Sequence, residues 1–317
     1  MHPKHTFADV EYDGQPRQTR RERFLQRMDA LLPWARLEER IRPVYPTGER
    51  GRPPYPLALL LRFHCVQLFY NLSDPAMEDA LYDSVSVQRF VGLTARDPRP
   101  DETTILHFRH LLERHDLGAG LLAEITQHLA SQGLRLREGT IVDATILDAP
   151  ASTKNRAQAR DPEMHQVKKG KQWYFGMKAH IGVDAETGLV HSVATTAANV
   201  ADITQVPQLL HGAETRVWGA AGYEGVARRP EHRGRAIDWQ VAVRGGQRRR
   251  LPPGSAAAQA EQRKASIRAK VEHPFLYVKR HFGYGQVRYR GLAKNRTRLC
   301  LLFGFASLLL AARAAPV

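Results

Sequence analysis

The chain has 317 residues, of which 43% are hydrophobic and 25% charged, so wholesale disorder and a fibrous repeat are excluded and about two domains are expected. Its two cysteines, Cys65 and Cys300, cannot make a disulfide framework, which favours a reducing cytoplasmic compartment. Residues 1–20 are polar and contain no secretory signal. The longest apolar run, 299–312, is shorter than the roughly 20 residues that span a bilayer. It predicts a buried helix and no membrane partner.

The net charge of +15 is concentrated in one segment. Residues 244–298 hold fifteen Lys and Arg residues against two Asp and Glu residues, so 13 of the 15 net charges lie there. A basic surplus packed in this way is typical of a protein that binds a polyanion. The alternative is a basic face that serves solubility, which does not require such concentration. Charge alone does not distinguish DNA from RNA.

The first 135 residues predict an all-helical domain. Residues 1–19 are expected to form a loose arm, and Ser73 to cap a helix that has Pro75 in its first turn. Short helices joined by tight turns fit a helix-turn-helix type of DNA-binding module, but they are also common in purely structural bundles. Apolar spacing places the helices over 20–37, 55–70, 74–82, 84–91 and 105–132.

Residues 136–317 predict an α/β domain with a mixed sheet. A strand over 139–149 is apolar on both faces, as a central strand should be, and two further strands flank a turn at 184–188. Polar loops are predicted over 151–172 and, as a basic insertion, over 244–260. The other predicted elements are a helix over 202–210, strands over 215–222 and 238–243, and helices over 261–282 and 294–312.

Two acidic residues are candidates for chemistry. Asp143 lies inside the apolar strand, where a carboxylate is costly unless it is paired, hydrogen-bonded or bound to a metal. Glu272 shares one face of the helix over 261–282 with Arg268 and Lys279, an arrangement suited to a metal-bound phosphate and its neighbours. A structural aspartate and an ordinary row of surface charges are the respective alternatives.

Several long strings together resemble the transposases of bacterial insertion sequences in the IS-five family. The similarity runs from Gly139 to Leu310 and extends more loosely into 100–113. The resemblance implies a ribonuclease H-like catalytic domain with a DDE triad of acidic residues, preceded by a helical DNA-binding region. The strings that carry it include GTIVDATILDAPASTKN, TAANVADITQ, GYEGV and KASIRAKVEHPFLYVKRHFGYGQVRYRGLAKN.

Carried over by position, the first acidic residue of the triad falls on Asp143 and the last on Glu272. Arg268 and Lys279 match the Arg and Lys of the signature around that Glu, whereas its Tyr falls on Ala265. The second acidic residue falls on Ala220, in the stretch GAAGY. The resemblance therefore implies a transposase that lacks one acidic residue, and neither Asp184 nor Asp202 is expected to replace it.

The resemblance also implies cofactors and partners. The triad is expected to hold two Mg²⁺ ions, with Mn²⁺ as a substitute, and Ala220 should weaken that site. The expected partner is double-stranded DNA, as terminal inverted repeats and target, bound by a homodimer associated with the bacterial nucleoid. Phosphate contacts are expected from Arg248, Arg249, Arg250, Lys264, Arg268 and Lys279.

Three functions follow from these expectations. The first is a cut-and-paste DNA transposase that is deficient in cleavage because of Ala220. The second is a non-catalytic DNA-binding protein that occupies element ends and represses transposition. The third is a metal-dependent nuclease of the ribonuclease H-like group with another substrate, against which sequence-specific binding to terminal repeats would argue. Trp218 and Tyr223 flank the candidate site and offer rings for an unpaired base, with core packing the expectation for Trp218.

Overall fold

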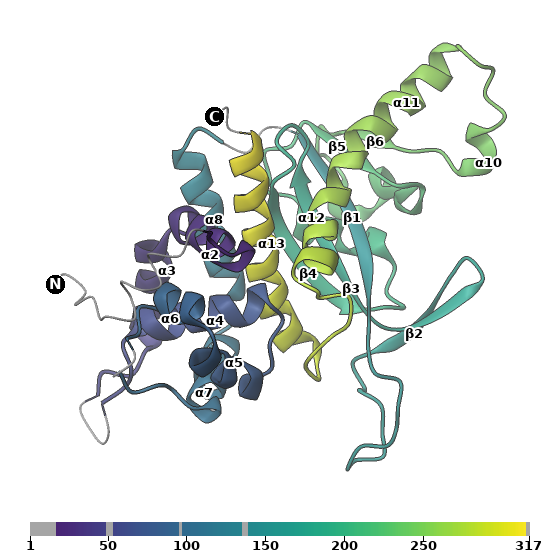
Figure 1. The fold of residues 1–317 in the computed structure, drawn as a ribbon. Helices are drawn as coiled ribbons and strands as arrows, with labels where there is room; N and C mark the ends of the chain where they lie inside the picture. Colours follow the sequence, from purple (N-terminus) through teal and green to yellow (C-terminus); the bar gives the residue numbers. More distant parts are fainter. Residues whose placement is uncertain (1–16, 49–52, 95–96, 135–138, 315–317) are drawn as a thin grey trace.

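The computed structural model describes residues 17–48, 53–94, 97–134 and 139–314. Helices from the first part of the chain gather on one side of the molecule and a mixed sheet forms the other (Figure 1). The last helix, α13 (Leu292–Ala314), lies between them and packs against both α8 and β4. The molecule is therefore an α/β structure in which a helical region precedes the sheet, as predicted.

The helical region begins at Arg20 and ends at Ser131. Two predicted helices are each broken in two: Pro33 separates α2 from α3, and a left-handed residue, Asp116, separates α7 from α8. Apolar spacing continues across both breaks, which is why it did not reveal them. The helices are α2 (Arg20–Leu31), α3 (Trp34–Ile41), α4 (Leu57–Phe69), α5 (Asp74–Asp83), α6 (Val85–Val91), α7 (Glu102–Arg114) and α8 (Leu117–Ser131).

Polar caps fix where these helices begin. The Ser73 hydroxyl accepts a hydrogen bond from the backbone N–H of Ala76, and Pro75 lies in the first turn of α5, which confirms the predicted cap. The Asp101 carboxylate accepts from Thr104 N–H at the start of α7 in the same way. Most of the predicted loose arm, residues 1–16, lies outside the described residues.

The sheet has six strands, β1 (Gly139–Asp148), β2 (His165–Lys169), β3 (Gln172–Asp184), β4 (Val190–Ala197), β5 (Arg216–Gly219) and β6 (Asp238–Val241). Its order is β2-β3-β1-β5-β6, and β4 also pairs with β3. The β1–β3, β2–β3 and β3–β4 pairs are antiparallel, whereas β1–β5 and β5–β6 are parallel. β1 is central, in agreement with its apolar faces. The predicted turn at 184–188 joins β3 to β4.

Two segments predicted as loops contain regular structure. Residues 151–172 include β2, an almost wholly exposed strand that pairs with β3 alone and forms with it an arm that projects from the sheet (Figure 1). Its polarity reflects exposure on both faces, so it carried no apolar alternation. Residues 244–260 include α10 (Gly245–Arg248) and the start of α11 (Ala256–Arg268), which form a second projection.

The predicted helix over 261–282 is a series of helical pieces. α11 ends at Arg268, a 3-10 turn leads to α12 (Glu272–Leu276), and a π-helix over Tyr277–His281 follows. Pro274 lies inside α12, where it has no N–H to donate, and the widened turn begins three residues later. The two short elements between β4 and β5 are η2 (Asp202–Gln205) and α9 (Val206–Leu209).

The helical region and the sheet share one core. A continuous cluster of buried apolar side chains runs from Leu25 in α2 through Leu302 in α13 to Ile181 in β3. The change from helix to strand falls near the predicted domain boundary at 135, but α13 serves both sides. Of the described helices, α13 alone is long and apolar enough to cross a membrane, and 78% of its apolar window is buried. Its position between two layers accounts for an apolar surface on all sides.

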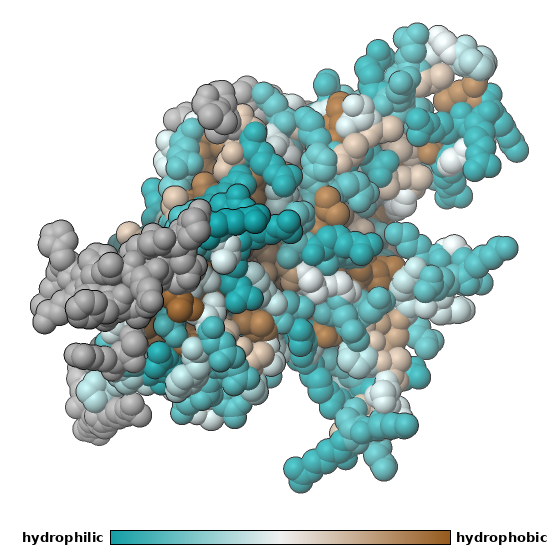
Figure 2. Space-filling model, in the orientation of Figure 1, coloured by the Kyte–Doolittle hydropathy of each residue, from teal (hydrophilic) through white to brown (hydrophobic). Residues whose placement is uncertain are grey.

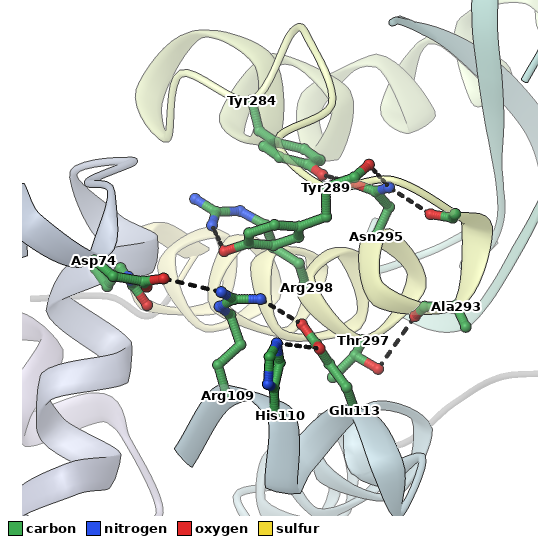
Figure 3. A network of polar contacts seen from close by, with 12 residues as sticks. Asp74, Arg109, His110, Glu113, Tyr284, Tyr289, Ala293, Asn295, Thr297 and Arg298 are labelled. Carbon is green, nitrogen blue, oxygen red and sulfur yellow. Dashed lines mark hydrogen bonds and ion pairs between the residues drawn. The ribbon is translucent and has the colours of Figure 1, made fainter. Parts of the chain in front are cut away.

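Polar contacts cross the same interface. Arg109 of α7 donates to Asp74 of α5 and to Glu113, and its guanidinium lies 4.2 Å from the ring centre of Tyr289 (Figure 3). Arg298 of α13 donates to the Tyr289 hydroxyl. The helical region is therefore held against the C-terminal part by a buried charge network as well as by apolar packing.

Candidate active site

Asp143 and Ala220 lie at the same level of two neighbouring parallel strands. The β1–β5 register pairs Val142 with Gly219, and the next residue on each side is Asp143 or Ala220. Partners in a parallel pair stand about 4.8 Å apart, so the two side chains are neighbours at the end of β5. The position that the sequence assigns to the missing acid is therefore beside Asp143.

A tyrosine closes the end of β5. Gly219 has no side chain, and a Cβ built there would lie 3.1 Å from Cβ of Tyr223, so glycine allows the ring to pack against the strand end. Tyr223 is only 1% exposed, and its hydroxyl has no hydrogen-bond partner among the described residues. Burial raises the pKa of Tyr223, and the negative charges of Asp143 and Asp202 raise it further. A buried hydroxyl without a partner thus lies within reach of the candidate acids.

The helical pieces after α11 bring a cation and an acid to this place. Nη2 of Arg268, the last residue of α11, lies 3.7 Å from Oδ2 of Asp143. Glu272, the first residue of α12, is exposed, and its negative charge acts on Asp143. Three of the sequence-predicted site residues therefore come together here, from β1, α11 and α12.

The surroundings of Asp143 favour its neutral form. Burial raises the pKa of the Asp143 carboxyl above its usual value, and the charges of Glu272 and Asp202 add to this rise. The N–H of Ala144, which donates to Oδ1 at 2.8 Å, and the Arg268 guanidinium act in the opposite direction. A cation placed here would be stabilised by Asp143 and Glu272 and would return the Asp143 pKa toward its usual value.

Lys279 lies farther along the same wall, in the π-helix. Its Nζ donates to the backbone carbonyl of Ile146 in β1 at 2.7 Å, and its side chain is half-buried. Burial lowers the pKa of Lys279, and the charge of Lys169 lowers it further, while Asp148 and Glu272 act the other way. The predicted common face of Arg268, Glu272 and Lys279 therefore exists, although the helix that carries them changes its winding twice.

Two other aspartates were considered as replacements for the missing acid. Asp184 is buried and its Oδ1 accepts from the N–H groups of Glu186 and Thr187, so it serves the turn between β3 and β4. Asp202 begins η2, which packs against the 3-10 turn after Ala220, but its carboxylate binds Lys178 Nζ at 2.8 Å. The local sequence gave no sign that Asp202 would lie so near Asp143.

The residues present do not fit a complete two-metal site. Mg²⁺ prefers carboxylate oxygens, which Asp143 and Glu272 offer and the Ala220 methyl group does not. Among the described residues no three His, Cys, Asp or Glu side chains come close enough to hold a metal ion together. An acidic side chain at position 220 would stand next to Asp143.

The predicted phosphate contacts fall into two groups. Arg248, Arg249 and Arg250 are exposed on the α10–α11 projection, where Figure 2 shows a hydrophilic surface. Lys264 instead binds internally, because its Nζ donates to the Val241 carbonyl and to the Glu261 carboxylate. Its ammonium fastens α11 to the end of β6, so we do not carry Lys264 forward as a DNA contact.

The aromatic side chains also differ from one sequence expectation. Trp218 is 8% exposed and Tyr223 1% exposed, so both rings pack in the interior, as expected for Trp218, and neither presents a face to an unpaired base. The exposed tryptophan is Trp173 on the β2–β3 arm, at 62%. Its position was missed because the neighbouring polar segment was taken as a loop.

Comparison with known protein families separates the same two regions. The family model of the transposase DDE domain matches residues 134–309. A second model, the transposase domain (DUF772), matches residues 13–111. No solved structure shows a significant match to the chain. The first match spans the strands and helices that carry Asp143, Ala220 and Glu272, and the second spans most of the helical region.

Proposed function

The chain belongs to the transposases with a DDE domain, and from this premise we propose that it binds the terminal inverted repeats of its own insertion sequence but is deficient in strand cleavage. The family acts on DNA in transposition and recombination and generally uses divalent metal ions such as Mg²⁺. The DDE domain implies a ribonuclease H-like fold, with which the mixed sheet and central β1 agree. We place the element among bacterial insertion sequences of the IS-five type on the strings given above.

The observation that carries this proposal is the place of Ala220. It follows β5 directly, beside Asp143 in the strand register, and Arg268 and Glu272 approach from the adjoining helices. In a two-metal site the acidic ligands hold the ions that stabilise both oxygens of an in-line displacement at phosphorus. Alanine supplies no ligand and removes one negative charge. Cleavage should therefore fall by orders of magnitude, while DNA binding does not depend on this position.

The proposed DNA contacts lie outside the acidic cluster. The helical region would read the repeat sequence, and Arg248, Arg249 and Arg250 would bind phosphates from the α10–α11 projection. Neutralising phosphates releases counterions, so binding should weaken steeply with salt. Transposition joins two element ends, so we propose a homodimer on DNA.

A second function rests on the same substitution. A protein that occupies element ends without cutting them would repress transposition by the active copies of its element. Ala220 favours this function, because it removes a metal ligand and leaves the DNA-binding surfaces unchanged.

The test compares the native chain with Ala220→Asp on a plasmid that carries the flanking ends of the gene. Both proteins are incubated with Mg²⁺ and scored for end-specific cleavage and for gel-shift binding. We expect equal binding and a rise in cleavage of at least about 100-fold in the variant, a common scale for the loss of one essential catalytic group. The triple change Ala220→Asp with Asp143→Asn and Glu272→Gln is the matched control and should bind without cutting.

Each other outcome has a definite meaning. Cleavage by the native chain at the same rate as Ala220→Asp would overturn the proposed deficiency. Binding by both proteins with cleavage by neither would favour the repressor and contradict the assignment of the triad. Cleavage without preference for the ends would favour a nuclease with another substrate.

A further inference from the structure

A polar cavity of about 330 Å³ lies beside the candidate active site. One wall is the end of β1, the strand that also carries Asp143, and another is the π-helix that follows α12 and Glu272. The third wall is the β2–β3 arm. The charged and aromatic side chains of the lining are Asp148, Lys169, Tyr174, Lys279 and Arg280.

Three cations converge on this cavity against one carboxylate. Lys279 is held in place by its bond to the Ile146 carbonyl, which leaves two of its three N–H groups for another acceptor. Within the described part of the chain, neither Lys169 nor Arg280 forms an ion pair with another side chain. Lys169 acts on Lys279 as a like charge. Cations brought together in this way are stabilised when an anion enters between them.

The arm adds an aromatic ring to the same cavity. Lys169 is paired with Gln172 in the β2–β3 register, and Tyr174 lies two residues farther on, so both point to one face of the arm. The Tyr174 hydroxyl donates to Oε1 of Gln172 at 3.0 Å, which restrains the ring. Cations for a phosphate beside a ring for a base or sugar are the combination by which proteins hold a nucleic-acid strand.

We propose that this cavity binds one phosphate of the DNA strand that enters the candidate active site, through Lys169, Lys279 and Arg280, with Tyr174 against the adjoining nucleotide. The inference rests on the proposed DNA-binding function and adds to it a subsite built by the β2–β3 arm. Because β1 and the π-helix connect the two places, the bound phosphate lies on the strand next to the phosphodiester at the acidic residues.

The first experiment measures DNA affinity against salt concentration by fluorescence anisotropy, with a labelled duplex that carries one element end. Lys169→Ala and Arg280→Ala are compared with the full native chain and with Arg216→Ala. Arg216 is the matched control because it is an exposed cation at the opposite end of β5, paired with Asp238. We expect the slope of log K against log salt to become less steep by about 0.9 for each cavity variant, the value for one lost phosphate contact. Arg216→Ala should keep the native slope.

A second experiment locates the phosphate. Single phosphates near the element end are replaced by neutral methylphosphonates, one at a time. One position should weaken binding by the native chain and by Arg216→Ala, and should have no further effect on Lys169→Ala, because the contact is already lost. Thermal melting of each variant verifies that it is folded.

The outcomes separate the inference from the function beneath it. Native protein that does not bind the element end contradicts both. Native protein that binds, with the same salt slope in the cavity variants as in Arg216→Ala, contradicts the cavity alone. Equal losses at every methylphosphonate position in Lys169→Ala and in the native chain also exclude a phosphate contact by Lys169.

Discussion

Two arginines of this molecule, Arg109 and Arg268, stand in different electrostatic surroundings. Arg109 has a side chain only 8% exposed and donates to two carboxylates, Asp74 at 2.9 Å and Glu113 at 3.0 Å (Figure 3). Arg268 is 23% exposed and has one carboxylate, Asp143, at 3.7 Å. The first arginine has strong, short partners on either side, whereas the second has one long contact.

The difference indicates what each region is built for. At Arg109 the charges of the chain compensate one another, which is what a buried ion network needs in order not to destabilise the fold. At Arg268 the opposing groups are incompletely paired, and Tyr223 beside them has a buried hydroxyl without a partner among the described residues. We interpret the first region as structural and the second as arranged for a ligand that the chain does not itself supply.

The largest effect on stability should come from the two arginines. Arg109→Met leaves two carboxylates without their cation and should lower the free energy of unfolding by about 3 kcal/mol. Arg268→Met removes a long, partly exposed contact and should lower it by about 1 kcal/mol or less. Urea denaturation measures both values. Equal losses in the two variants would remove the contrast between the regions.

A smaller contrast is expected between two buried tyrosines. The Tyr284 hydroxyl donates to the side chain of Asn295, so Tyr284→Phe leaves a buried acceptor unpaired and should cost about 1–2 kcal/mol. Tyr223→Phe removes a hydroxyl that has no described partner and should be neutral or stabilising by up to about 1 kcal/mol. Denaturation curves of the two variants provide the comparison. A loss at Tyr223 as large as that at Tyr284 would show that its hydroxyl is satisfied in solution.

The sequence predicted the elements whose periods are local. β1, the turn at 184–188, the cap at Ser73 and the buried α13 agree with the structure because apolar alternation and capping residues lie within a few positions of one another. The break at Pro33 and the strand β2 were missed. Apolar spacing continues past the first, and the second is exposed on both faces, so neither altered the pattern.

The site was less accessible to sequence reasoning. Asp143 and Glu272 were identified from a buried carboxylate and from a helix face, and the resemblance added Ala220 as the third position. That Ala220 stands beside Asp143 depends on the parallel pairing of β1 with β5, which no local period encodes. The approach of Asp202 and the cavity under the β2–β3 arm likewise depend on contacts between segments far apart in the chain.

The central claim is that position 220 lacks a metal ligand beside Asp143, and Mn²⁺ binding to the full chain tests it without DNA. Titration calorimetry would compare the native chain with Ala220→Asp, and with Ala220→Asn as a control of similar size without the charge. We predict at least about tenfold tighter binding by Ala220→Asp than by either of the others, since even outer partners of metal ligands change affinity by 10–100-fold. Equal Mn²⁺ affinity in all three proteins would contradict the claim.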